Sequence, residues 1–316
     1  MAGETKPKIF LIVGPTASGK TAASITTAKR INAEIISADS IQVYKGLDIG
    51  SAKPSAEEMD GVPHHLLDFA DIDDTSFNVS VFRELAIKKI GEIQSRGKNV
   101  LIVGGTGLYV NSLIYPLNFS QAEPDFERRA ELEQLEQNSP GVLHGMLASF
   151  DPDSAERLHP NDTKRIIRAI EVFEKTGSTL SAHGSDFANE RGETIAFDPV
   201  IAGITMDRAR LYRRIEKRID MMMEAGLLDE VDSIIEKGYA SDLPALQGLG
   251  YKQLIMYRKG EVSLDEAVEL IKRDTRRFAK RQISWFKRDK RIRWFSADEP
   301  EIAERIKDYF LAELNN

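Results

Sequence analysis

The chain is organised around the stretch Gly14-Pro15-Thr16-Ala17-Ser18-Gly19-Lys20-Thr21. This stretch follows an apolar run, Lys8 to Val13, and precedes a helix-forming run, Ala22 to Ile31. The order is strand, glycine-rich loop and helix, with the spacing G-x-x-x-x-G-K-[ST] of a loop that cradles phosphate groups. An ordinary glycine turn is the alternative, but the strand and the helix both stand where a phosphate site needs them. We therefore predict a phosphate-binding loop at residues 14–21, called the P-loop below.

Each part of the P-loop suits an anionic ligand. Gly14 and Gly19 let the backbone bend so that several N–H groups face one oxyanion. The N-terminus of the following helix adds the positive end of its dipole. Lys20 supplies a point charge, and the Thr21 hydroxyl is placed to hold Mg²⁺ beside the phosphates. The motif predicts Mg²⁺ as the cofactor but does not say which phosphate ester binds.

Composition limits the classes of protein that the chain can form. Its 316 residues suffice for two domains, or for one domain with a large insertion. Cysteine is absent, which excludes disulfides, thiolate nucleophiles and cysteine-based zinc sites. No apolar run reaches membrane-spanning length, and residues 1–8 lack the apolar centre of a signal peptide. We expect a cytoplasmic protein without a membrane partner, acting as a monomer.

Charge is distributed unevenly along the chain. The net charge is −7, yet the segment Lys272–Arg293 contains eleven Lys or Arg and two Asp. That segment carries a local charge of +9, which leaves −16 on the rest of the chain. An acidic body with one basic segment is typical of localised contact with a phosphate backbone, although such runs are often only solvated helix faces. The pattern favours a nucleic-acid partner.

The apolar runs predict a parallel sheet. Further strands are expected at Ala33–Ala38, Asn99–Val103 and Pro199–Met206, with helices between them. The predicted fold class is α/β, a P-loop NTPase-like parallel sheet flanked by helices. Asp39 directly follows the second strand, and functional residues of such sheets gather at the carboxyl ends of the strands. We therefore expect Asp39 on the same rim as the P-loop, although an Asp in a turn is often only a cap.

A helical insertion divides this core. From about Tyr115 the sequence changes to charged helices separated by prolines, and an apolar strand returns near Pro199. We predict a core domain of residues 1–114 and 200–316, which ends in basic helices, and a helical insertion domain of residues 115–199. Residues Ile41–Pro54 are turn-rich but too apolar for a linker, so we expect a loop that closes over a site. Ser178–Gly192 is polar and predicts another loop.

Six separated motifs resemble one family. They are GPTASGKT at Gly14, SADSIQVYKGLDIGSAKP at Ser37, VGGTGLY at Val103, HPNDTKRIIRAIEV at His159, QGLGYKQ at Gln247 and AKRQISWFKR at Ala279. In this order they resemble the bacterial tRNA dimethylallyltransferases, also called tRNA isopentenyltransferases, from about Ile9 to Arg288. Ser284 and Lys287 stand where the family more often has Thr and Arg. The zinc-binding extension of the eukaryotic members is missing.

The resemblance implies a reaction. The family transfers a dimethylallyl group from dimethylallyl diphosphate to the exocyclic amine of the adenosine 3′ to the tRNA anticodon. It implies that the P-loop, residues 14–21, binds the diphosphate in place of a nucleotide, with Mg²⁺ on Thr21. It also implies that Asp39 is the general base, which agrees with its expected place on the rim. Lys20, Thr21, Thr106 and Arg128 complete the catalytic set, and Arg128 aligns least securely.

The resemblance also implies a tRNA interface around the anticodon stem-loop. Its expected residues combine backbone charge with recognition of an unpaired loop, which is the usual mode for RNA. Carried over by position, they are Asp39, Ser40, Ile41, Gln42, Thr106, Lys164, Arg165, Ile166, Ile167, Arg168, Gln247, Gly248, Leu249, Gly250, Tyr251, Lys252, Lys280, Arg281, Gln282, Ile283, Ser284, Trp285, Phe286 and Lys287.

Two alternatives stay open at this point. A small-molecule or nucleotide kinase would bind ATP at the P-loop, and the arginine-rich run after Asp207 resembles the elements that close such sites. It would leave the basic segment Lys272–Arg293 unexplained, and the strand ending at Val103 lacks the metal-binding Asp of many P-loop hydrolases. The other alternative is a non-catalytic RNA-binding protein that uses a nucleotide as a switch.

Overall fold

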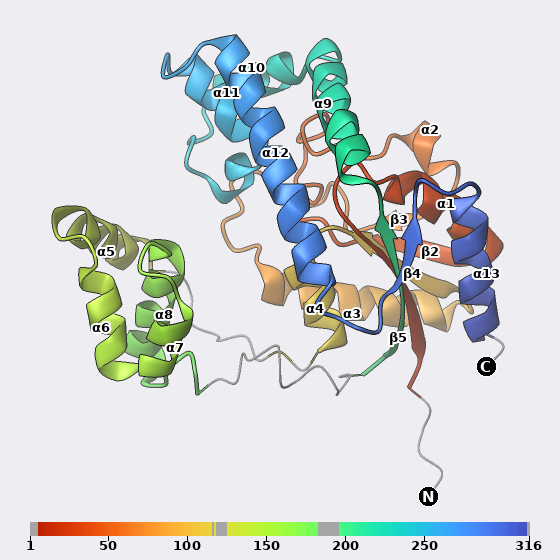
Figure 1. Ribbon diagram of the computed structural model, residues 1–316, viewed down its shortest axis with the longest axis horizontal. Coiled ribbons are helices and arrows are strands. Elements are labelled where there is room, and N and C mark those ends of the chain that lie inside the picture. The colour runs from red at the N-terminus through yellow and green to blue at the C-terminus, as the bar shows by residue number, and fades with distance from the viewer. Residues whose placement is uncertain (1–5, 116, 118–124, 183–195, 315–316) are drawn as a thin grey trace, which may run out of the picture. The chain divides into compact units, whose positions relative to one another are not determined.

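The computed structural model describes residues 6–115, 117, 125–182 and 196–314 and divides the chain into two compact units (Figure 1). The core unit comprises Met1–Ile114 and Thr194–Asn316, and the insertion unit comprises Tyr115–Glu193. Residues 118–124 and 183–195, which include most of the predicted loop Ser178–Gly192, lie outside the described residues. Each unit is considered by itself below.

Six strands form one sheet in the core unit. They are β1 (Lys8–Val13), β2 (Ala33–Ser37), β3 (His64–His65), β4 (Asn99–Gly104), β5 (Asp198–Thr205) and β6 (Arg293–Ser296). The sheet order is β3-β2-β4-β1-β5-β6, and every pair is parallel. The central strands are continuous apolar runs, as expected for a sheet covered on both faces. The predicted α/β parallel fold is confirmed.

The strand register brings three loops to one rim. Val13, the last residue of β1, stands opposite Gly104 of β4 and Gly203 of β5. Ser37, the last residue of β2, stands opposite Val103 of β4. Because parallel strands end at the same edge, the P-loop, Asp39 and the loop after β4 start side by side.

Helices cover both faces of this sheet. The helices of the core unit are α1 (Lys20–Arg30), α2 (Ala56–Met59), α3 (Val79–Ser95), α4 (Gly107–Ile114), α9 (Arg208–Glu224), α10 (Leu227–Glu236), the short 3₁₀ helix η1 (Pro244–Gln247), α11 (Tyr251–Arg258), α12 (Leu264–Phe286) and α13 (Ile302–Leu314). On one face α1 and α13 pack against β1 and β5 (Figure 1). In this layer the rings of Phe10 and Phe310 lie 4.9 Å apart. Helices α3 and α4 pack together, and each also contacts β4. The glycine stretch after β4 leads directly into α4, which begins at Gly107.

A second group of helices stands beyond the carboxyl rim. Helix α9 pairs with α12 through Glu216 and Arg276 at 2.6 Å and through Asp220 and Lys272 at 2.8 Å. Helix α11 joins α12 through Gln253, whose amide donates to Asp274 at 3.2 Å. The basic segment up to Phe286 therefore forms the second half of the long helix α12, which runs down toward the rim of the sheet (Figure 1), and its last residues lead into β6.

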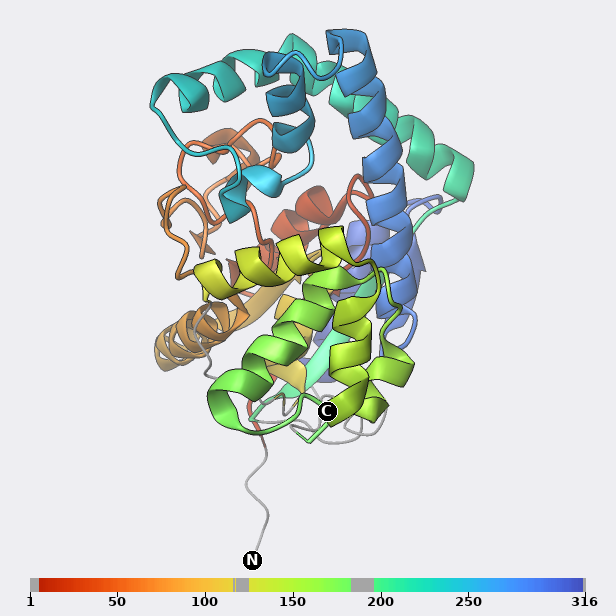
Figure 2. The same ribbon diagram turned by 90° about the vertical axis from the view of Figure 1, so that its left-hand side faces the viewer.

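Four helices pack side by side in the insertion unit (Figure 2). They are α5 (Phe126–Asn138), α6 (Val142–Phe150), α7 (Pro152–Arg157) and α8 (Thr163–Thr176). Their apolar core includes Leu132, Leu147 and Ile170. Glu171 of α8 is 1% exposed and is paired with Arg129 and Arg168. Burial opposes its ionisation, but these arginines and the Asp125 N–H lower the pKa of Glu171 to about 2.

Candidate active site

The P-loop has the conformation that its sequence requires. Gly14 has φ of 150°, and a Cβ there would stand 2.6 Å from the backbone oxygen of Ile204 in β5. Gly19 has φ of 94° and precedes α1, whose start no side chain of the described residues caps. The hydroxyl of Ser18 is buried and has no hydrogen-bond partner among the described residues. Uncapped N–H groups and an unsatisfied hydroxyl around one hollow fit a bound anion.

Three cationic side chains lie at this loop. Lys20 Nζ donates to the Pro15 carbonyl oxygen at 2.7 Å. Burial and the nearby charge of Arg218 lower the pKa of Lys20 to about 8, while Asp39 acts in the opposite direction. Burial also lowers the pKa of Arg218, again opposed by Asp39. Arg214 Nη2 lies 3.9 Å from the position of a Cβ at Gly19. Helix α9 thus brings Arg214 and Arg218 to the P-loop.

These cations lack matching anions in the described part of the chain. Neither Arg214 nor Arg218 has a carboxylate within ion-pair distance there. The charge of Asp39 acts on both Lys20 and Arg218, and the charge of Glu58 acts on Arg218 as well. A concentration of positive charge that the protein does not neutralise is what a diphosphate would complete. The sequence had singled out the arginines after Asp207 without assigning them to the site; their i, i+4 spacing was the available signal.

Asp39 is held by the turn that it begins. Its Oδ1 accepts hydrogen bonds from the backbone N–H of Ile41 at 2.9 Å and of Gln42 at 3.3 Å. Its Oδ2 has no hydrogen-bond partner among the described residues, and the side chain is partly exposed. One oxygen therefore fixes the carboxylate while the other is available. That arrangement suits a group that must accept a proton.

Thr106 stands beside Asp39. Its Oγ1 accepts from the Ser40 N–H at 3.2 Å and donates to Ser40 Oγ at 3.4 Å, and its own N–H donates to the Ala38 carbonyl oxygen at 3.3 Å. The loop after β4 can approach this closely because Gly104 has no Cβ, which would stand 2.1 Å from Ala38 O. Thr106 thus ties the loop after β4 to the turn that carries Asp39.

The end of α12 packs onto both loops. Gln282 is buried, and its amide accepts from the Thr16 N–H at 2.9 Å and donates to the Gly105 carbonyl oxygen at 2.9 Å. A Cβ on Gly107 would stand 2.2 Å from the ring of Trp285. The inner face of α12 therefore braces the P-loop against the loop after β4.

The predicted tRNA set mixes exposed and buried side chains. Exposed members are Lys164, Arg165, Gln247, Lys252, Lys280, Arg281, Ser284 and Lys287. Buried members are Ile166, Ile167, Tyr251, Gln282 and Phe286. For these five the contact with tRNA stays a prediction, and their side chains pack inside their own units. Helical periodicity explains the mixture, since a contiguous range on a helix always includes inward-facing positions.

Arg128 has carboxylate partners within the insertion unit. Its guanidinium donates to both carboxylate oxygens of Glu174, at 3.0 and 2.7 Å, and to Glu131 at 2.9 Å. Arg168 and Arg165 are likewise paired, with Glu171 and Asp162. The catalytic assignment of Arg128 stays a prediction.

The residues around Thr21 fit a magnesium ion. Thr21 borders a small cavity of about 30 Å³ whose walls include Ser37 and Gln42. Such a space can hold water. Mg²⁺ usually keeps several waters and binds a few protein oxygens together with substrate phosphates. Thr21 offers one such oxygen at the start of α1, so the predicted ion would share its ligands with the diphosphate. No group of three or more potential metal-ligating His, Asp or Glu side chains occurs in the described ranges.

Fold and site together define a class: a parallel α/β protein that has the sequence of a phosphate-binding loop after its first strand and a carboxylate on the same rim of the sheet. The family model described as IPP transferase matches residues 42–289. The chain belongs to this family. The P-loop and Asp39 precede the matched residues, so their place in the site rests on the geometry above.

Similar proteins cover nearly the whole chain. A tRNA dimethylallyltransferase of Acetivibrio thermocellus is 49% identical over 308 residues, which is 96% of this chain and 97% of that protein. Another, of Carboxydothermus hydrogenoformans, is 47% identical and covers 98% of each. The predicted family and enzyme class are confirmed.

Solved structures of tRNA isopentenyltransferases and dimethylallyltransferases are also similar to this chain. The full-length tRNA isopentenylpyrophosphate transferase of Bacillus halodurans is similar with a TM-score of 0.73 and 41% identity, over 98% of this chain and 97% of that one. A eukaryotic dimethylallyltransferase acting on tRNA is similar with a TM-score of 0.78 and 28% identity, over 97% and 80%. In the described residues, no helix has both the length and the apolar character needed to cross a bilayer.

Proposed function

We propose that this enzyme transfers a dimethylallyl group from dimethylallyl diphosphate to the exocyclic N6 amine of the adenosine 3′ to the anticodon in tRNA. The observation that carries the proposal is the unneutralised cationic P-loop with Asp39 at the same rim of the sheet. One end of that arrangement suits a departing diphosphate, and the other suits an amine that loses a proton.

The donor's diphosphate would lie in the P-loop. The allylic C–O bond breaks, and its electron pair stays on the diphosphate oxygen. The P-loop N–H groups, Lys20, Arg214 and Arg218 face that oxygen's developing charge, and preorganised donors of this kind stabilise the transition state. Mg²⁺ on Thr21, when bound, would neutralise part of the same charge. Lys20 is thereby a ligand of the leaving group.

The acceptor's amine would face Asp39. As the new C–N bond forms, a proton leaves N6 and passes to the Asp39 carboxylate, whose Oδ1 is already held by the turn. Thr106 keeps that turn against the loop after β4. An adenosine inside a folded stem-loop must be unstacked to reach a rim of this kind, at a cost of a few kcal/mol. Its entry would also exclude water from the allylic centre.

Exposed basic residues would hold the RNA. Lys280 and Arg281 lie on the exposed face of α12, and the exposed Lys287 directly follows this helix. The buried face of α12 contacts the catalytic loops through Gln282. Their charge suits the phosphate backbone, while Ser40, Ile41 and Gln42 lie beside Asp39 and suit the unpaired loop. In the insertion unit Lys164 and Arg165 would add further backbone contacts. A monomer is proposed as the acting form.

The test is transfer of label from dimethylallyl diphosphate to an unmodified anticodon stem-loop. We expect label in the RNA with wild-type enzyme, and a loss of about 10²–10⁴-fold in the transfer rate for Asp39→Ala with RNA binding retained. ATP consumption with a small acceptor, in place of labelled RNA, would support the kinase alternative. Full turnover by Asp39→Ala would show that Asp39 is not the base.

A further inference from the structure

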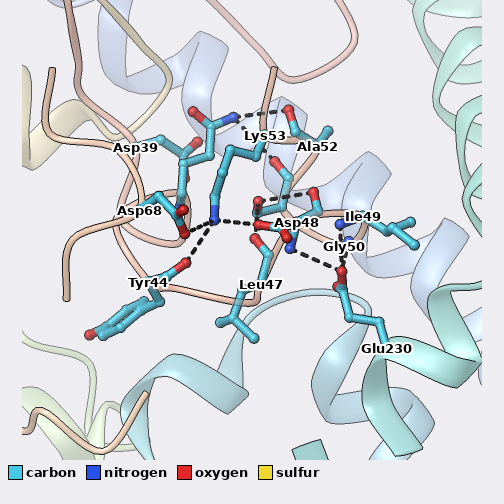
Figure 3. A network of polar contacts seen from close by, with 12 residues as sticks. Asp39, Tyr44, Leu47, Asp48, Ile49, Gly50, Ala52, Lys53, Asp68 and Glu230 are labelled. Carbon is cyan, nitrogen blue, oxygen red and sulfur yellow. Dashed lines mark hydrogen bonds and ion pairs between the residues drawn. The ribbon is translucent and has the colours of Figure 1, made fainter. Parts of the chain in front are cut away.

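The segment that follows Asp39 is anchored by one carboxylate from a distant helix. Glu230 of α10 faces the turn Asp48–Gly50 (Figure 3). Its Oε2 accepts from the backbone N–H of Asp48 at 3.0 Å and of Ile49 at 2.8 Å, and its Oε1 accepts from that of Gly50 at 3.1 Å. Three successive backbone N–H groups thus converge on a single side chain.

The backbone N–H groups of this turn form an anion-binding site, and the carboxylate of Glu230 occupies it. Successive N–H groups that point to one side form a concavity that attracts negative charge, and bonds to a carboxylate are stronger than bonds between neutral groups. A fourth donor is the hydroxyl of Tyr251, 2.6 Å from Glu230 Oε1. Tyr251 is 0% exposed, and a Cβ on Gly50 would stand 2.6 Å from its ring. The contact is therefore closely packed.

Tyr251 stays a donor over the whole working range of pH. Burial, followed by the nearby charge of Glu230, raises the pKa of its hydroxyl far above the ordinary value. The backbone around it is fixed as well, since the Gly250 N–H donates to Gln253 Oε1 at 3.1 Å. The start of α11 thus presents a fixed hydroxyl to Glu230. This also explains why a motif expected to contact RNA contains a fully buried tyrosine.

A chain of hydrogen bonds connects the anchored turn to Asp39. Gln42 Nε2 donates to the carbonyl oxygens of Ser51 at 3.3 Å and Ala52 at 3.1 Å, directly after the turn. The backbone N–H of Gln42 donates to Asp39 Oδ1. Its side-chain oxygen accepts from Ser37 Oγ, on the last residue of β2, at 3.1 Å. Gln42 therefore spans from the end of β2 to the turn that Glu230 holds.

Lys53 connects several parts of the same loop through its ammonium group. Lys53 Nζ donates to the Tyr44 carbonyl oxygen at 2.8 Å and to Asp68 Oδ1 at 2.8 Å, and it also pairs with Asp48 (Figure 3). Asp48 belongs to the turn that Glu230 binds. The loop 41–54, expected from the sequence to close over a site, is thus internally bonded, and Glu230 is its anchor to the helices beyond the rim.

We propose that Glu230 is a positioning residue for prenyl transfer: by filling the turn at residues 48–50 it holds Gln42, and through Gln42 it fixes the Asp39 carboxylate. The inference rests on the proposed role of Asp39 as the base. It makes Glu230 act on the acceptor half of the reaction alone, because its backbone partners lie on loop 41–54, its remaining partner is Tyr251 of α11, and none of these hydrogen-bond partners belongs to the P-loop. Loss of the anchor should therefore reduce turnover without weakening the binding of the donor's diphosphate.

The experiment compares four variants of the full chain. Glu230→Ala removes the whole anchor, and we expect kcat to fall about 10²-fold, the typical result of misplacing a reacting group by about 1 Å. Glu230→Gln retains one acceptor oxygen, so its kcat should lie between that of Glu230→Ala and that of wild type. Tyr251→Phe removes one donor and should lose the least. Glu236→Ala, at the exposed end of the same helix, is the matched control and should equal wild type.

A second measurement separates positioning from stability. The inhibition constant of inorganic diphosphate should stay within about twofold of wild type in every variant that keeps the wild-type melting temperature. Wild-type kcat in Glu230→Gln and Tyr251→Phe, or a parallel loss of kcat and diphosphate affinity, would overturn the inference. Failure of the proposed function looks different, because wild-type enzyme would then not label RNA or Asp39→Ala would keep its turnover.

Discussion

Two clusters of charge in this protein are built on opposite principles. In the core unit Lys20, Arg214 and Arg218 gather at the P-loop, and Asp39 is the carboxylate that acts on Lys20 and Arg218. In the insertion unit Glu171 is enclosed by the guanidinium groups of its two arginine partners. Among the described residues no carboxylate lies within ion-pair distance of the cations of the first cluster, whereas in the second both arginines are paired with Glu171.

The pKa values report the same contrast. Burial and a neighbouring cation lower the pKa of Lys20 to about 8, so the site disfavours the charged form of its own lysine. The pKa of Glu171 is lowered to about 2 despite its burial, so its surroundings stabilise the charged form. Removing one partner from a paired buried cluster destabilises the fold. In an unpaired cluster, a ligand of opposite charge relieves the repulsion between the like charges.

Removing a cation from the core cluster should have the largest effect of the changes considered, and the effect should be on activity. Arg218→Ala should lower kcat/KM for dimethylallyl diphosphate about 10²–10³-fold, the usual effect of losing one donor to a developing oxyanion. Because the variant also relieves repulsion with Lys20, its melting temperature should equal or exceed that of wild type. Arg213→Ala, on the exposed side of α9, is the control. A loss of stability with unchanged kcat/KM would mean that Arg218 is structural.

Removing the anion from the insertion cluster should have the opposite effect on stability. Glu171→Ala leaves two arginines facing a buried gap, and we expect the free energy of unfolding to fall by about 3 kcal/mol. Urea unfolding of the full chain measures this, and Glu174→Ala, in a more exposed pair, should cost less than about 1 kcal/mol. Since the pKa of Glu171 is depressed, its contribution is present at neutral pH and is lost as the pH falls toward 2. Equal losses in the two variants would contradict the distinction.

The smallest expected effect is one of pH. Lys20 carries its proton below about pH 8 and loses it above, so the affinity of the free enzyme for inorganic diphosphate should fall toward tenfold for each further pH unit. Titration calorimetry between pH 6.5 and about 9.5 measures this. Lys20→Arg stays charged throughout and should show a flatter profile. Identical pH profiles for wild type and Lys20→Arg would mean that a group other than Lys20 causes the pH dependence.

Much of the core was predictable because its signals are local. The predicted strands at Ala33–Ala38, Asn99–Val103 and Pro199–Met206 each match an observed strand to within one residue at either end. The parallel order then brings Asp39 to the P-loop rim without further information. The tRNA set stays a prediction at the level of single side chains. Motif ranges carried over whole include Tyr251 and Gln282, which face inward.

The sequence alone determined the phosphate loop, the α/β class, the rim position of Asp39 and the family, since each depends on spacing within a few residues or on the order of motifs. Tertiary structure decided which distant side chains meet those elements. Glu230 reaches a turn about 180 residues earlier in the chain, and Arg218 and Gln282 reach the P-loop from helices beyond the rim. Periodicity tells which face of a helix is buried, but the partner it is buried against is set only when the chain packs.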